Sequence, residues 1–167
     1  MAFVGRSLMP ARNDGQKDAE RDDRVPLDVI ARFKALWESR VASATFSDEA
    51  PAFGWWFASG RFDDAWSLAE LLRAARTARS IDGLMFGADR FRRLSESMPV
   101  EAAQFVYALV CGHERQSWIF ELDKVLRPAL ETILRSGGPA AALGEQIVNA
   151  LGERQIADYT DLLRNRR

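Results

Sequence analysis

The side chains best suited to chemistry lie together in the run Cys111-Gly112-His113-Glu114, which joins a thiol, an imidazole and a carboxylate. Such groups build cysteine nucleophiles and zinc sites. A structural zinc ion takes four ligands, however, and the single Cys and single His of this chain supply only two without distant carboxylates. The flanking residues carry no signature of either site. We therefore interpret the run as a helix end with a buried thiol and a histidine facing the helix dipole.

Other catalytic patterns are missing from the sequence. It contains no Gly-rich phosphate loop, no Gly-x-Ser-x-Gly elbow, no His-Glu-x-x-His run and no paired cysteines. The sequence therefore predicts a protein that is not an enzyme, with no catalytic residue, no cofactor and no bound metal.

An aromatic cluster, residues 53–66, holds six of the seventeen Phe, Trp and Tyr side chains. Aromatic faces can stack on bases or hold a cation while a carboxylate supplies charge, which makes Trp55, Trp56 and Asp63 candidates for an interaction surface. In the favoured alternative, Asp63 or Asp64 caps a helix and the tryptophans pack between helices. We expect Trp55 to face outward and the following side chains to be buried: Trp56, Phe57, Phe62 and Trp66.

Arginines recur at helical spacing in Arg73, Arg76 and Arg79, and three more follow at 90, 92 and 93. One face of such a helix could contact phosphates. Acidic residues are interspersed, and long Arg side chains commonly cover exposed helix faces, so a solvated surface is the favoured interpretation. Arg73, Arg76 and Arg79 remain candidates for the interaction surface.

Composition limits the class of protein. The 167 residues include 23 basic and 24 acidic side chains, so bulk charge gives no reason to expect polyanion binding. The lone cysteine excludes an internal disulfide, and no secretory signal is recognised at the N-terminus, which together indicate the cytoplasm. No apolar run reaches membrane-spanning length. We expect a disordered N-terminal arm over residues 1–24 and a single domain over residues 25–167.

Apolar periodicity indicates an all-α domain of about seven to eight helices, without any alternating pattern typical of strands. Pro128 should kink or split one of them. The expected helices cover about 26–41, a short segment ending at 57, 64–78, 84–98, 100–111, 118–135, 139–151 and 156–163.

The helix starts near Asp64, Pro99 and Pro139 are 35 and 40 residues apart, and each opens a pair of helices. Stacked helical hairpins of this period build HEAT- or armadillo-like α-solenoids. An irregular α-bundle is the alternative.

The segment Trp55-Trp56-Phe57-x-Ser59-Gly60-x-Phe62-Asp63-x-x-Trp66-x-Leu68-x-x-Leu71-Leu72 resembles a pattern in HEAT-like helical regions near the C-termini of large bacterial proteins, some with Sir2-like or nucleotide-hydrolase domains. The resemblance covers about residues 53–163. It implies a binding or scaffolding region without catalytic residues.

The sequence as a whole thus predicts a non-enzymatic helical-repeat module that binds a protein partner or a second copy of itself. Nucleic-acid binding or processing, through the arginine-rich helix face and the aromatic cluster, is the alternative.

Overall fold

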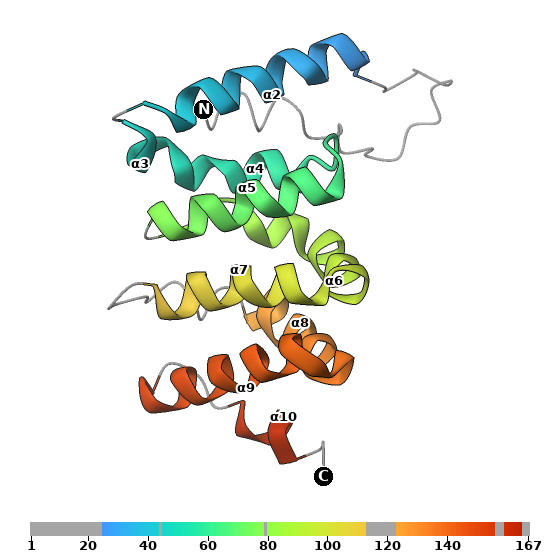
Figure 1. Cartoon of the computed structure of the whole chain (residues 1–167), viewed down its shortest axis with the longest axis vertical. Helices are drawn as coiled ribbons and strands as arrows, with labels where there is room; N and C mark the ends of the chain where they lie inside the picture. The colour runs from blue at the N-terminus through green and yellow to red at the C-terminus, as the bar shows by residue number, and fades with distance from the viewer. Residues whose placement is uncertain (1–24, 44, 79, 113–122, 156–158, 165–167) are drawn as a thin grey trace, which may run out of the picture.

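The computed structural model describes residues 25–43, 45–78, 80–112, 123–155 and 159–164 (Figure 1). The described residues form helices and turns, with no strand among them, as the periodicity predicts. The arm expected over residues 1–24 lies outside the described residues. The elements are α2 (Leu27–Val41), α3 (Phe46–Glu49), the 3₁₀ turn η1 (Ala50–Ala52), α4 (Phe53–Ala58), α5 (Asp64–Thr77), the 3₁₀ turn η2 (Leu84–Gly87), α6 (Ala88–Ser97), α7 (Pro99–Cys111), α8 (Asp123–Ser136), α9 (Gly138–Glu153) and α10 (Thr160–Arg164).

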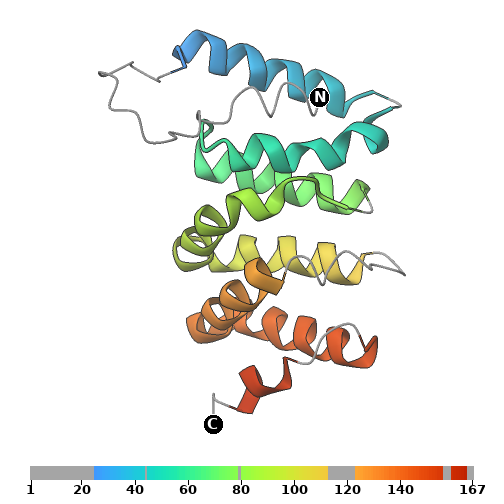
Figure 2. The ribbon, with the colours of Figure 1, turned by 180° about the vertical axis from the view of Figure 1, so that it is seen from behind.

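The helices are arranged in two layers. In one layer, α5, α7 and α9 lie side by side and face the viewer in Figure 1. In the other layer α6 packs against α8, on the side seen in Figure 2. Helix α2 lies at one end of the molecule and α10 at the other, so each inner helix has neighbours on both sides.

Proline, glycine and aspartate mark the helix boundaries, as expected from the sequence. Asp63 accepts a hydrogen bond from the Trp66 amide at 2.9 Å and caps α5. Pro99 is the first residue of α7, where its missing N–H costs nothing. Gly137 precedes α9 with φ 76°, a left-handed conformation that favours glycine.

Pro128 does not divide its helix, because α8 runs undivided from Asp123 to Ser136. Of the two predicted outcomes, a kink or a split, the split is wrong. Proline removes the hydrogen bond to the carbonyl four residues earlier. That carbonyl belongs to Lys124, which is exposed and can bind water instead. Trp118 lies outside the described residues.

The buried face of α5 differs from the expected one. A single stripe of Trp66, Ala69, Leu72 and Ala75 predicts one apolar face, yet Ala69 is exposed and Ala75 is fully buried. Leu68 and Leu71, which share a helix face with Ala75 at i, i+3, i+7 spacing, are also buried. The reason is position: α5 contacts α4 and η1 on one side and α7 on the other. A helix between two neighbours buries a wider arc than an amphipathic surface helix.

None of the described helices combines the length and the apolar content needed to cross a membrane.

Candidate interaction surface

The aromatic cluster forms part of the core. Trp56 is fully buried, with its ring stacked between Phe53 at 6.4 Å and Phe62 at 5.6 Å between centroids. The Trp37 ring of α2 also packs against the Trp56 ring, with centroids 5.6 Å apart. Phe57 and Phe62 are buried as expected. Trp56 is buried as expected and therefore cannot contribute to the candidate interaction surface.

Trp55 and Trp66 are both partly buried, so neither the outward-facing Trp55 nor the buried Trp66 expected from the sequence is observed. The Trp55 ring stacks on Phe86 of η2, with centroids 5.0 Å apart. Gly83 adopts φ 71°, and a Cβ there would lie 2.5 Å from the Trp55 ring, so only glycine allows this approach. Met85 and Phe86 remain 56% and 60% exposed.

Asp63 is the N-cap of α5 and also an ion-pair partner of Lys34 from α2. Lys34 in turn lies 4.9 Å from the centre of the Trp66 ring. The hydrogen bond from Lys34, followed by that from the Trp66 amide, holds the pKa of the Asp63 carboxyl below its ordinary value. Asp63 thus connects α2 to α5, and its charge is paired with Lys34 of the same chain.

Two Asp63 substitutions separate the cap from the charge. Asp63→Ala removes both, and we expect a loss of about 0.5–2 kcal/mol in the free energy of unfolding. Asp63→Asn keeps the cap oxygen and should cost less than Asp63→Ala. Because the folded-state pKa is lowered, the charge stabilises the fold above the unfolded-state pKa of about 3.9 and stops doing so as the pH falls through the folded-state value. Urea unfolding between pH 6 and 3 should therefore show the gap between wild type and Asp63→Asn narrowing at the acidic end. A gap that stays constant would contradict the role of the charge.

Arg90, at 8% exposure, is a buried cation on α6. Its guanidinium donates to the Phe57 carbonyl at 2.6 Å and to the Phe62 carbonyl at 2.7 Å. It also donates to Asp64 Oδ1 at 2.7 Å and to Ser67 Oγ at 3.1 Å. The sequence pattern grouped Arg90 with exposed arginines, whereas the structure places it under the turn that connects α4 to α5.

The other candidate arginines differ in whether they have an ion-pair partner. Arg73 pairs with Glu70 at 3.5 Å, and Glu70 also accepts a hydrogen bond from Trp37 Nε1 at 2.9 Å. Arg76, one turn further along α5, is exposed, and no ion pair or side-chain hydrogen bond is found for it among the described residues. Arg79 lies outside the described residues. Among the described members of the predicted arginine stripe, Arg73 is paired and Arg76 has no ion-pair partner.

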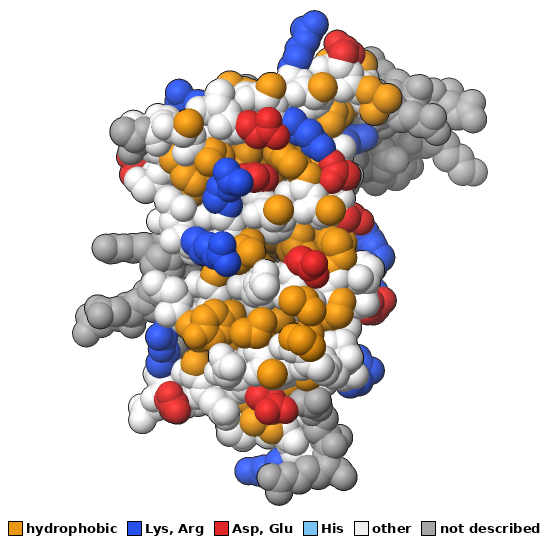
Figure 3. Space-filling model, viewed as in Figure 1, with side chains coloured by type: hydrophobic (Ala, Val, Ile, Leu, Met, Phe, Trp, Pro, Cys, Tyr) orange, Lys and Arg blue, Asp and Glu red, His pale blue; other side chains and the backbone are white. Residues whose placement is uncertain are grey.

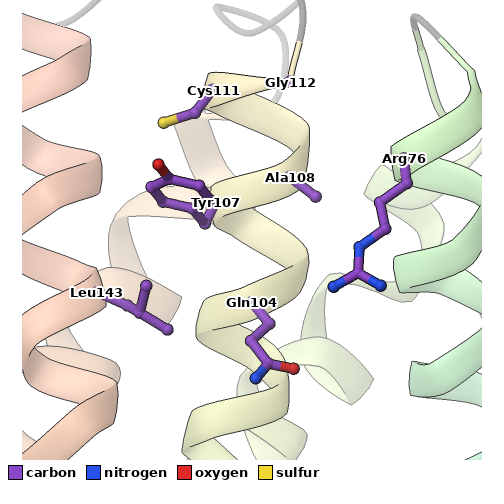
Figure 4. Close-up of a pocket in the computed structure, with 7 residues that line it drawn as sticks. All are labelled: Arg76, Gln104, Tyr107, Ala108, Cys111, Gly112 and Leu143. Atoms are coloured by element: carbon purple, nitrogen blue, oxygen red, sulfur yellow. The ribbon is translucent and has the colours of Figure 1, made fainter.

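A groove of about 440 Å³ lies on the α5–α7–α9 layer, where Arg76 projects. Figure 3 shows hydrophobic side chains exposed on this face between the levels of α7 and α9, with Lys or Arg side chains above them. In Figure 4, Arg76 extends from α5 toward Gln104 of α7, whereas Tyr107 and Leu143 lie on the α9 side. The lining residues are Arg76, Gln104, Tyr107, Ala108, Cys111, Gly112 and Leu143.

The groove side chains can bind a ligand, but the thiol among them is not a nucleophile at neutral pH. Burial raises the pKa of the Cys111 thiol, and the charge of Arg154 offsets only part of this. The thiol is therefore protonated at neutral pH and acts as a small apolar group. The expected helix end at Cys111 is confirmed, because α7 ends there, but the thiol is only partly buried rather than buried. His113 and Glu114 lie outside the described residues.

Four groove residues escaped the sequence-based expectations: Gln104, Tyr107, Ala108 and Leu143. The available signal was weak. Gln104 and Tyr107 continue the exposed i, i+3 row that begins at Glu101, on a helix in which Phe105, Val106 and Leu109 are buried.

In the part of the chain that the structure describes, no three His, Cys, Asp or Glu side chains are close enough together to hold a metal ion. Comparison with protein-family models, with curated proteins and with solved structures finds no match. The functional assignment therefore depends on the groove and its surroundings.

Proposed function

We propose that this chain is a non-enzymatic binding module built from HEAT-like helical hairpins, and that the α5–α7–α9 layer contacts a segment of a partner protein. The groove on that layer carries the proposal. It combines an arginine, an amide and a phenol with apolar lining residues, and it opens on the face formed by α5, α7 and α9. Helical-repeat proteins bind partners across such rows of equivalent helices.

The size of the groove suits part of a protein segment. A volume of about 440 Å³ is within the range of small ligand sites and accommodates a few side chains. Tyr107 is 39% exposed, and tyrosine provides contact area at a low entropic cost.

Binding to nucleic acid is the weaker alternative. A phosphate backbone is bound by several cations together. Here Arg90 is buried, Arg73 pairs with Glu70, and Arg92 pairs with Glu96 at 3.2 Å. These contacts leave Arg76 as the cation directed into the groove.

Site-specific photo-cross-linking tests the proposal. A benzophenone amino acid replaces Gln104 in the groove or, as the control, Arg93 on the exposed surface of α6. Irradiation in the cells that make the protein should give a defined cross-linked protein from position 104 and not from position 93. Adding Tyr107→Ala should reduce the yield at least several-fold, because it removes an apolar contact of the groove. Mass spectrometry identifies the partner, including a second copy of this chain.

Equal cross-linking from both positions, or a yield insensitive to Tyr107→Ala, would contradict the groove as the binding face.

A further inference from the structure

We propose that the groove recognises an acidic side chain of a partner peptide, and that an apolar side chain close to that acid binds beside it. This inference rests on the proposed function and specifies the chemistry of the partner. It follows from the division of the groove into a polar half and an apolar half.

The polar half is formed by Arg76 and Gln104. In Figure 4 the Arg76 guanidinium is directed from α5 toward the Gln104 side chain on α7. Both side chains are exposed, and the hydrogen bonds and ion pairs of the described residues leave both uncommitted. A guanidinium presents parallel N–H donors that match a carboxylate, and an amide adds another donor. Charge complementarity therefore favours an anionic group in this half.

The apolar half is formed by Tyr107, Cys111 and Leu143. Tyr107 and Cys111 lie on the α9 side of α7, and Leu143 faces them from α9 (Figure 4). The protonated thiol and the leucine provide apolar surface, and the tyrosine ring adds an aromatic face. An aliphatic or aromatic side chain would bury this surface.

A single carboxylate fits the groove better than a chain of phosphates. Arg76 is the one arginine among the described lining residues, and Arg73, the arginine one turn away, is paired with Glu70. One cation beside apolar surface matches one acidic side chain with an apolar neighbour. A polyphosphate backbone would leave most of its charges without a partner.

Peptide selection supplies the probe. A phage-displayed library of random 12-residue peptides is selected on the immobilised full-length protein. Enriched peptides are then synthesised with Glu, Gln or phosphoserine at the acidic position and titrated by calorimetry. We expect enriched peptides to contain Asp or Glu within two positions of an aliphatic or aromatic residue.

Arg76→Gln in the protein, or Glu→Gln in the peptide, should each weaken binding about ten- to a hundredfold, as expected for a hydrogen-bonded ion pair. The two changes together should cost little more than either alone, because they remove the same contact. Arg93→Gln, an exposed arginine on α6, is the matched control and should leave the affinity unchanged. Arg76 is exposed, so circular dichroism should show an unchanged fold.

The variants test separately whether the groove binds a peptide and whether it recognises an acidic side chain. If Tyr107→Ala weakens binding but Arg76→Gln does not, the groove binds a peptide without recognising an acid, and this inference is overturned while the proposed function stands. If neither variant matters, both fail. Tighter binding of the phosphoserine peptide by more than tenfold would replace the carboxylate with a phosphate. Binding of a 20-nucleotide single strand or duplex, with steep salt dependence and loss on Arg76→Gln, would overturn the peptide assignment.

Discussion

Arg90→Leu is expected to lower the free energy of unfolding by about 3–5 kcal/mol, because two buried carbonyls lose a charged donor and each such bond contributes about 1.5–3 kcal/mol. For a chain of this size, such a loss corresponds to a fall of roughly 10 °C or more in the melting temperature. The physical reason is the set of acceptors left behind. Arg90 donates to the Phe57 and Phe62 carbonyls at 2.6 and 2.7 Å, and a leucine replaces neither bond.

The geometry of Arg90 explains the expected size of the effect. The two carbonyls flank the turn at Gly60, which adopts φ 68°, and the guanidinium also lies over the Phe57 ring at 4.9 Å. One side chain of α6 thus fixes the end of α4 and the start of α5. Arg90→Lys retains the charge but not the planar fork, so it should recover only part of the loss.

Two controls isolate this role. Arg93→Leu makes the same change at an exposed position of α6 and should stay within about 0.5 kcal/mol of the wild type. Asp64→Asn removes the carboxylate from the network, but Asp64 is 60% exposed at its side chain, so we expect a loss of about 1 kcal/mol or less. Thermal unfolding followed by circular dichroism compares all four variants. Equal melting temperatures for Arg90→Leu and Arg93→Leu would show that the buried network does not stabilise the fold.

The sequence was informative about helix ends because these depend on local chemistry. Asp63 caps α5, Pro99 opens α7 and Gly137 precedes α9, and each effect acts within one turn. The prediction of which α5 side chains are buried, and the prediction of an exposed Arg90, were wrong for another reason. Both depend on which helices become neighbours, and spacing along one helix carries no information about that.

The candidate site was less predictable than the fold. Arg76, Tyr107 and Leu143 belong to three different helices, about 31 to 36 residues apart, and only the packing of α5, α7 and α9 brings them together. The sequence identified Arg76 by its spacing. It could not identify the groove residues of α7 and α9, because an exposed tyrosine or half-buried leucine has no distinctive pattern by itself.

The polar contacts of the first helices narrow the choice of functional residues. Asp63 is committed to Lys34 and to the α5 cap, and Glu70 is committed to Trp37 and Arg73. These groups connect α2 to α5 across the end of the molecule. Charged residues that a sequence pattern suggests for recognition are thus used for packing. The polar groups without a partner among the described residues, Arg76 and Gln104, lie on the exposed faces of α5 and α7.

Trp56→Ala is expected to cost about 3–5 kcal/mol, the range for deleting a fully buried large aromatic side chain. Trp56 has no exposed surface, and its ring contacts Phe53, Phe62 and, at 5.8 Å, Phe33 of α2. The truncation leaves a cavity between α2 and α4 that these rings cannot fill without moving away from each other. Urea unfolding at neutral pH measures the loss.

The neighbouring tryptophan is the matched control. Trp55 is half-buried against Phe86, so Trp55→Ala should cost about 1–2 kcal/mol, mainly from one stacked pair and partial burial. The same substitution at two adjacent residues then separates core packing from edge packing. If Trp55→Ala were as costly as Trp56→Ala, the contact between α4 and η2 would contribute as much as the central stack. If Trp56→Ala were nearly neutral, the aromatic cluster would not be the core, and recognition by its rings would again explain the density of aromatic residues.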